Sequence, residues 1–539
     1  MKLKRTFISI VALMLAVCLM PTALAATWYL EDGDITVIAN ENGQSVKQGS
    51  NSAVADSDTV ITQRDSEKAT DNTITVSTTD DTTANITIED VNINSYGDAI
   101  DVGSSGANIT LEGDNKLNSE YGSGLHVSDG DVTITGSGSL EAGSKNDSNN
   151  NAAIGSHENE AMSGDITIGG DAQVTAVSRD DGAGIGSGDM GEMSGDITIG
   201  DNAQVTAWSE TGGAGIGSGR ESNMSGNITI GGSAQVTAGS NSETAGIGSG
   251  NNGSITSAGR IIIRDSAKVT AIGEDEGTGI GAGDGEHMAG LIIIQDNAQV
   301  TAIAGDRAAA IGSDNLDEMT GTIIIIGNAR VTTGILDDDD VYFDYNTKEI
   351  IYTLDENATG YIGDSKYSNH ASDYGHYVIG PDVTINGISG SDIEALKDYI
   401  NMRLSGENHD GEPENLTKLE IRSENGEFTV TADGEGTVEK ILYDGSETVP
   451  TAPGTYPVTC VVRFGDETLE FQIGTFIVPE PPVEAAQPAP VYHVTDKDGN
   501  QIPYTAAREG GVLTIRVDAA YARLTLTADE AQALTAQSV

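Results

Sequence analysis

The 539-residue chain has few of the residues that stabilise most exported domains. Its two cysteines are Cys18 and Cys460, and Cys18 lies in an N-terminal apolar segment that we expect to be removed, which excludes an intramolecular disulfide. Aromatic residues make up 4% of the chain, which excludes a wide aromatic core but suits a thin core of Ile and Val. Beyond the N-terminal segment, no apolar run is long enough to cross a membrane as a helix.

Basic residues are also scarce. Lys and Arg number 27 against 83 Asp and Glu, which gives a formal net charge of −56 at pH 7. Such a surface repels nucleic acid and anionic lipid, so neither is an expected partner. It attracts Ca²⁺, mostly as a diffuse atmosphere rather than at fixed sites.

Residues 1–25 have the three parts of a secretory signal peptide. A basic start with Lys2 and Arg5 is followed by the apolar run 8–20 and by an Ala-Leu-Ala cleavage site. A lipoprotein box that ends at Cys18 is the alternative, and the valine before that cysteine fits it poorly. We therefore predict an extracellular or cell-surface bacterial protein with no membrane insertion after cleavage, stabilised by its strands instead of by disulfides.

Repetition is what the chain has in abundance. The segments GDITIG, AQVTA and AGIGSG recur in this order, and Ile154, Ile185 and Ile216 mark a period of 31 residues. Self-similarity at such a period means a solenoid, a propeller or an array. Each repeat contains three short runs in which apolar and polar residues alternate, as they do in strands.

These observations predict an all-β fold, a right-handed parallel β-helix with three strands per coil. A propeller blade needs four strands in a longer repeat, and leucine-rich repeats need Leu at fixed positions. Parallel crossovers are almost always right-handed. Coils of 23 residues continue the same apolar columns upstream, so we expect nine coils within residues 85–335.

Smaller units are expected around this β-helix. Residues 26–84 are predicted to form an N-terminal cap and a first, looser coil. Residues 336–380, which hold seven of the sixteen tyrosines, are predicted to form a Tyr-rich C-terminal cap. Residues 381–414 are a connector with a helix over 391–404, since this segment begins with a capping box and has apolar residues at helical spacing.

The last third of the chain is predicted to hold small β modules. Residues 415–478 alternate as strands, and the YDG and PTAPGTY stretches from Tyr443 to Tyr456 resemble the Ig-like modules of bacterial surface proteins. Residues 479–490 are a stiff Pro-rich linker. Residues 491–539 are expected to form a small β module.

Two kinds of surface residue are candidates for ligand binding. Alternation along the AQVTA strand places its Thr and Gln outward in columns that could match a repeating polymer: Thr175, Thr206, Thr237, Thr270, Thr301, Gln173, Gln204 and Gln235. The alternative is that β-branched Thr favours strands and stacks on itself. The rings of Tyr345, Tyr352 and Tyr361 are either a platform for stacking sugars or a cover for the last coil.

Acidic turns beside the AGIGSG strand are candidates for binding Ca²⁺. Calcium takes six to eight oxygen ligands from carboxylates and turn carbonyls. The candidate ligands are Asp180, Asp181, Asp189, Asp275, Asp284 and Asp314. The alternative is that these turns are only solvated, because the acidic residues do not hold fixed columns and the nonapeptide of calcium-loaded β-rolls is absent.

No catalytic residue is predicted. β-Helix folds include pectate lyases and polygalacturonases, which need a basic residue beside Ca²⁺ or paired carboxylates at working distance. In this chain the outward positions repeat monotonously, and His126, His157 and His287 are each expected to be solvated alone. A polysaccharide lyase or glycoside hydrolase of the pectinase type is the alternative function, and a structural stalk is the second alternative.

Residues 26–340 resemble the secreted clostridial carbohydrate-binding β-helix proteins, through the ANITIEDVNI and ANITLEGDNKL coils and the AGIGSG repeats. The resemblance implies a non-enzymatic surface protein of a Gram-positive bacterium that binds polysaccharide and carries Ca²⁺. No motif is specific enough to transfer a ligand residue. We therefore expect an adhesin or binding protein for polysaccharide, host glycan or cell-wall glycan, with Ca²⁺ as the one candidate cofactor.

Overall fold

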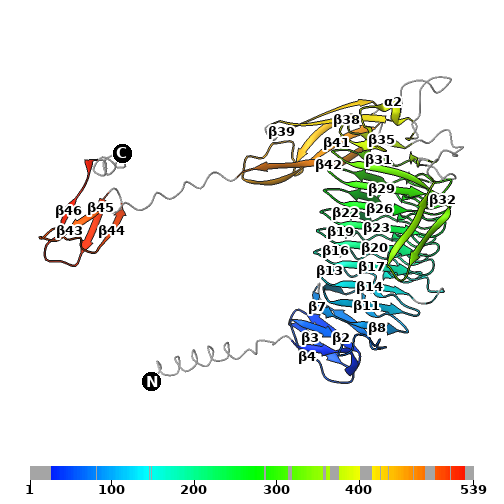
Figure 1. Cartoon of the computed structure of the whole chain (residues 1–539), viewed down its shortest axis with the longest axis horizontal. Coiled ribbons are helices and arrows are strands. Elements are labelled where there is room, and N and C mark those ends of the chain that lie inside the picture. Colours follow the sequence, from blue (N-terminus) through cyan, green and yellow to red (C-terminus); the bar gives the residue numbers. More distant parts are fainter. Residues whose placement is uncertain are drawn as a thin grey trace. The chain divides into compact units, whose positions relative to one another are not determined.

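The computed structural model (Figure 1) is divided into two compact units, one of residues 1–451 and 455–477 and one of residues 452–454 and 478–539. Among the described residues, none of the helices is long and apolar enough to cross a membrane. The structure describes residues 26–528 except 80–81, 145, 147, 285–286, 314–318, 356–357, 359, 364–374, 398, 401–415, 425–426, 435, 465–466, 480–491 and 510–511. The expected signal peptide of residues 1–25 and the Pro-rich linker therefore lie outside the described residues, apart from Pro479.

The first unit is a parallel β-helix, as predicted, in which each coil contributes one strand to each of three long sheets (Figure 1). Sheet 1 has the order β1 (Thr27–Tyr29), β5 (Thr59–Thr62), β7 (Thr83–Glu89), β10 (Gly106–Glu112), β13 (Val132–Gly136), β16 (Ile166–Ile168), β19 (Ile197–Ile199), β22 (Asn227–Ile230), β25 (Arg260–Ile263), β28 (Leu291–Ile294), β31 (Thr322–Ile325), β35 (His376–Ile379), β38 (Leu416–Glu424) and β39 (Glu427–Gly434).

Sheets 2 and 3 hold the other two strands of each coil. Sheet 2 has the order β8 (Asn92–Ser95), β11 (Asp114–Ser119), β14 (Ser139–Ser144), β17 (Gln173–Ser178), β20 (Gln204–Ser209), β23 (Gln235–Ser240), β26 (Lys268–Ile272), β29 (Gln299–Ala304), β32 (Arg330–Asp344), β36 (Thr384–Ile385) and β37 (Ile388–Ser389), and β33 (Glu349–Leu354) pairs with β32. Sheet 3 has the order β4 (Val54–Ala55), β3 (Gly43–Gln48), β2 (Ile35–Asn40), β6 (Ile74–Thr78), β9 (Ile100–Gly103), β12 (Leu125–Val127), β15 (Ile154–Gly155), β18 (Ile185–Gly186), β21 (Ile216–Gly217), β24 (Ile247–Gly248), β27 (Ile280–Gly281), β30 (Ile311–Gly312) and β34 (Ile362–Gly363).

The apolar columns expected from the repeat form the core. Ile166, Val174 and Ile185 each point inward from one of the three sheets and are at most 2% exposed. In sheet 3 the register pairs Ile185 directly with Ile216, so each coil stacks its side chain on that of the next. An additional buried column was not predicted from the repeat. It consists of Met162, Met193, Met224, Ile255, Met288 and Met319. No coil could bury these faces alone, so the stack itself is the stable unit.

The segment 336–380 differs from the expected cap on the last coil. β32 runs on past sheet 2 and turns back as β33, and this hairpin packs against the outer face of sheet 2. Its Val341 and Phe343 cover Trp208 and Ile303, which face outward from the coils. The remaining described part of the segment supplies coil strands β34 and β35, with Tyr377 buried in the core. The apolar outward residues of sheet 2 thus explain why the hairpin lies along its side.

The connector contains a shorter helix than the predicted 391–404. Helix α2 (Ile393–Leu396) is one turn long, and Ile400 then forms a parallel bridge with Ile362 of sheet 3. Leu396 and Ile400 are at most 1% exposed and belong to the main core. The helical pattern is overridden because these two side chains cover the end of the stack. Residues 401–404 lie outside the described part of the chain.

The predicted Ig-like domain is not confirmed. β38 extends sheet 1, and the three-stranded sheet of β40 (Thr437–Tyr443), β41 (Gly454–Phe464) and β42 (Glu467–Val478) packs against the outside of sheet 1. The contact is apolar because the outward column of sheet 1 changes from Thr229 to Ile262 and Ile293. Cys460 of β41 is buried in this second core, and burial raises the pKa of its thiol to about 12.

The second unit contains two small antiparallel sheets. β43 (His493–Thr495) pairs with β46 (Arg523–Thr525), and β44 (Tyr504–Glu509) pairs with β45 (Val512–Val517). Residues 491–528 therefore carry β structure of the kind expected for a small module, within the part of that segment that the structure describes.

Candidate functional site

The predicted Thr and Gln columns lie on the outer face of sheet 2. The register pairs Thr175 with Thr206 and Gln173 with Gln204. The Thr pairs continue unbroken to β29, whereas Lys268 of β26 interrupts the Gln column. The Gln side chains are exposed, whereas the Thr side chains are half-buried. The next outward column, which begins at Val177, is covered by the β32–β33 hairpin. The accessible strip is therefore narrower than the flat lattice that the sequence suggests.

The three predicted tyrosines do not share one platform. The Tyr345 hydroxyl donates a hydrogen bond to Glu210, and the Arg179 guanidinium lies 4.5 Å from the Tyr345 ring centroid. Tyr352 packs against the apolar cluster under the hairpin. Tyr361 lies before β34 and is half-buried. The structure thus uses Tyr345 and Tyr352 to seat the hairpin on sheet 2.

Asp180, Asp181 and Asp189 come together, but around a guanidinium rather than an open cation site. Arg220 Nε lies 3.2 Å from Asp181, and Arg220 Nη2 lies 3.3 Å from Asp189. Burial raises the pKa of Asp189, and the arginine opposes that rise. Two of the expected calcium ligands of this turn, Asp181 and Asp189, are therefore already paired with a positive charge from the next coil.

The other predicted calcium ligands form a looser acidic group. Burial and then the charge of Asp284 raise the pKa of Glu243, and Asp275 adds a smaller effect of the same sign. Carboxylates on neighbouring turns commonly gather without an ion, so this group by itself does not indicate one. Asp314 lies outside the described residues.

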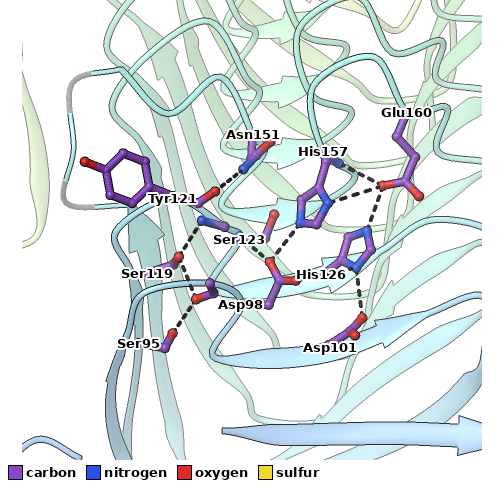
Figure 2. Close-up of polar contacts among 12 residues, drawn as sticks. Ser95, Asp98, Asp101, Ser119, Tyr121, Ser123, His126, Asn151, His157 and Glu160 are labelled. Atoms are coloured by element: carbon purple, nitrogen blue, oxygen red, sulfur yellow. Dashed lines mark hydrogen bonds and ion pairs between the residues drawn. The ribbon is translucent and has the colours of Figure 1, made fainter. Parts of the chain in front are cut away.

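A cluster that the sequence did not predict lies on sheet 3 where the short coils give way to the long ones (Figure 2). We call it the histidine cluster: Asp98, Asp101, His126, His157 and Glu160. Asp98 lies in the turn before β9, Asp101 in β9 and His126 in β12. His157 and Glu160 follow β15. Three successive coils thus contribute side chains to one group.

The two imidazoles are stacked and hydrogen-bonded at both ends. Their ring centroids are 3.8 Å apart and their planes differ by 3°. At one end, His126 Nδ1 lies 2.9 Å from Asp101 and His157 Nε2 lies 2.8 Å from Asp98. At the other end, His126 Nε2 lies 2.8 Å from Glu160, and His157 Nδ1 lies 3.6 Å from the same carboxylate. The expectation that His126 and His157 are each solvated alone is wrong.

The carboxylates determine the charge of the cluster. Burial acts to lower the pKa of His126, but the hydrogen bonds to Asp101 and Glu160 and the charge of Asp98 outweigh it and raise the pKa to about 9. Burial acts to raise the pKa of Asp98, yet the hydrogen bond from His157 and its charge hold that pKa below the usual value. Near neutral pH, His126 is therefore an imidazolium between carboxylates.

From β15 onward, one outward position of each sheet 3 strand is glycine, and we call this series the glycine column. The cluster can form because β9 and β12, which precede the glycine column, have side chains at that position. Register places Asp101, His126 and Gly155 in one outward column, and every later strand of the sheet has glycine there. Gly186 shows why: its φ is 142°, and a Cβ would lie 1.7 Å from the carbonyl oxygen of Gly217. Side chains therefore fit this column only in the first coils.

A signal for the cluster was present in the sequence. The column of Ile100, Leu125 and Ile154 fixes the register of sheet 3, and the residues that follow them place Asp101 beside His126. Three donor atoms, one each from Asp98, His126 and His157, lie within 4.8 Å of one another, close enough to bind one metal ion. Both histidines are already hydrogen-bonded to carboxylates.

An exposed aromatic pair lies near the cluster. Tyr96 and Tyr121 come from the turns after β8 and β11, with ring centroids 4.7 Å apart and planes inclined by 45°. They are 72% and 50% exposed. The Tyr121 ring points away from the imidazoles (Figure 2), so the pair and the histidine cluster are two separate features.

Compared with protein-family models, with curated proteins and with solved structures, the chain matches none of them. Its function must therefore be argued from the geometry alone.

Proposed function

We propose that this protein is a secreted, non-enzymatic cell-surface β-helix protein that binds polysaccharide or another glycan. The observation that carries the proposal is the exposed Tyr96–Tyr121 pair, which presents two rings from consecutive coils. Large aromatic side chains gain free energy when they leave water, and an exposed group of them commonly marks a binding surface. Tilted rings side by side suit the apolar faces of sugar rings.

Polar groups that can bond sugar hydroxyls lie on the same coils. Asn94 and Asn118 are paired in register and face outward from β8 and β11, and Lys116 is exposed beside them. The Gln columns continue the outer face of sheet 2 along the later coils. A polymer seated on the tyrosine pair would therefore meet amide groups that repeat at the strand spacing of about 4.8 Å.

The test is binding of the full chain without residues 1–25 to pectin, cellulose, xylan and mucin glycans, with Ca²⁺ and with EDTA. Tyr96→Ala and Tyr121→Ala should each weaken retention about tenfold, since one stacking contact contributes about 1 kcal/mol beyond its buried area. Tyr342→Ala is the matched control, because Tyr342 is 55% exposed on the hairpin. A loss in EDTA alone would support assistance by Ca²⁺.

Other outcomes would favour the alternatives. Release of reducing or unsaturated sugars would make the protein a polysaccharide lyase or glycoside hydrolase. Equal binding by wild type and by both tyrosine variants would remove the pair as the anchor. No retention on any glycan would favour a structural stalk.

A further inference from the structure

We propose that the histidine cluster binds one divalent transition-metal ion of the zinc class, held by Asp98, Asp101, His126 and His157. The inference does not rest on glycan binding, because the Tyr121 ring points away from these groups (Figure 2). It assigns a different ion and different residues from the calcium turns that the sequence suggests.

The donor atoms at one end of the two imidazoles already converge. His157 Nε2 lies 2.8 Å from Asp98 Oδ1, while His126 Nδ1 lies 3.9 Å from Asp98 Oδ2 and 2.9 Å from Asp101 Oδ1. Two nitrogens and two carboxylates make up the four ligands that Zn²⁺ prefers. Calcium takes six to eight oxygens, so two imidazole ligands disfavour it.

Glu160 completes the arrangement from the opposite end. Its carboxylate faces His126 Nε2 at 2.8 Å and His157 Nδ1 at 3.6 Å, which are the two ring nitrogens that the ion would not use. A metal-binding histidine almost always donates its other N–H to a carboxylate, carbonyl or water, which fixes the ring and raises its basicity. Here a single glutamate is placed to orient both rings.

The metal-free geometry shows what binding must change. The rings are parallel, so their in-plane lone pairs do not yet point to one position, and one ring must tilt out of the stack. The protons that His126 Nδ1 shares with Asp101 and His157 Nε2 shares with Asp98 leave these nitrogens for solvent as two metal–nitrogen bonds form, and each bound ring keeps an N–H toward Glu160. The two carboxylates that accept those hydrogen bonds become ligands themselves.

The position of these side chains in the repeat also favours a dedicated site. The residue equivalent to His157 is Gly188 in the following coil, where a Cβ would lie 2.4 Å from the His157 carbonyl carbon. The position of His126 is likewise glycine in every later coil. Both positions are glycine in the four coils marked by Ile185, Ile216, Ile247 and Ile280, so the imidazoles occupy positions where those coils have no side chain.

The experiment is titration of the full chain without residues 1–25, stripped with EDTA and dialysed, with Zn²⁺ by calorimetry in excess Ca²⁺. Bound zinc is also measured by elemental analysis after gel filtration. We expect one ion per chain and a rise in Tm on loading. His157→Gly, which installs the residue of the later coils, should weaken binding about 100-fold or more and abolish the rise in Tm, since even indirect partners of a metal affect affinity 10- to 100-fold.

Two further variants separate the site from the diffuse acidic surface. His287→Gly changes an exposed histidine outside the cluster and should leave affinity unchanged. Glu160→Gln should weaken binding roughly 10- to 100-fold without removing a ligand. Zinc binding that is absent, that disappears in excess Ca²⁺, or that is equal in wild type and His157→Gly would overturn the proposal.

Discussion

The short coils at the start of the β-helix and the long coils that follow share one core but differ on sheet 3. In the short coils the outward column holds Asp101 and His126, whereas in the long coils it holds glycine from Gly155 onward. The glycine column lets successive backbones approach so closely that no Cβ fits between them. The regular long coils therefore have no side chains in this column of sheet 3. Side chains that could bind an ion occur instead where the short coils give way to the long ones.

The largest effect is expected from a charge in the core that both regions share. Ile216 is completely buried and stacks on the isoleucines of both neighbouring coils. Ile216→Asp would bury an unpaired carboxylate and should destabilise the β-helix by about 5 kcal/mol. Urea unfolding followed by circular dichroism measures it. An unchanged midpoint would show that this column does not point inward.

The second-largest loss of stability is expected when a side chain is added to the glycine column. Gly217 has φ 141°, and a Cβ there would lie 1.8 Å from the carbonyl oxygen of Gly248. Gly217→Ala should destabilise the protein by about 3 kcal/mol through backbone strain and displacement of the next coil. Gly200→Ala is the control, since a Cβ at Gly200 would meet nothing within 4 Å. Equal stability of Gly217→Ala and wild type would remove the proposed difference between the coils.

The histidine cluster should make stability depend on pH at its end of the helix. The pKa of His126 is raised to about 9 in the folded protein from 6.5, so its contribution is complete below pH 6.5 and is lost as pH rises through 9. The shift corresponds to on the order of 3 kcal/mol. The pKa of Asp98 is lowered, so its contribution is lost instead as pH falls below its usual value of 3.8.

Denaturant unfolding in EDTA at pH 6 and pH 10 tests this sign. Wild type should lose more stability than His126→Gln between the two values, and the two proteins should converge at the higher pH. A wild-type stability that rises over this range relative to the variant would contradict the assigned ion pairs.

The smallest effect is expected where the hairpin tip meets the early coils. Lys348 pairs with Glu141 at 2.5 Å, and both side chains are about one-third exposed. Lys348→Met should change the free energy of unfolding by less than about 1 kcal/mol, because exposed ion pairs are screened by water. Trp208→Ala is the contrast, since it removes the apolar contact that seats the hairpin and should increase proteolysis within 336–354. Equal proteolysis of the two variants would show that the hairpin is not held by its apolar face.

The repeat allowed the core to be predicted but not the parts that cover it. The spacing of Ile185 and Ile216 is sufficient to assign an inward column, because a parallel stack leaves one register that buries them. Ile262 and Ile293 lie in continuous apolar runs, and their own side chains point outward. Such continuous runs are typical of a sheet that is buried on both faces. That signal was present, but alternation alone did not indicate which later strands would cover it.

The candidate sites are harder to predict from the sequence, because the partners of each side chain come from the neighbouring coil. Asp189 is a predicted calcium ligand, but Arg220 lies one period later and pairs with it. His126 and His157 are 31 residues apart in the sequence, and the register of sheet 3 places them on adjacent coils. In a solenoid the neighbours of a side chain lie one coil away, so a site must be sought along the columns.

The most direct test of the account is hydrogen exchange of the full chain with and without the glycan that it retains best. The account predicts that protection increases in residues 92–121, where the tyrosine pair and its amide neighbours lie. Protection confined to the regular strands between 173 and 301, with no change around Tyr96 and Tyr121, would contradict the central claim that binding occurs where the repeat begins.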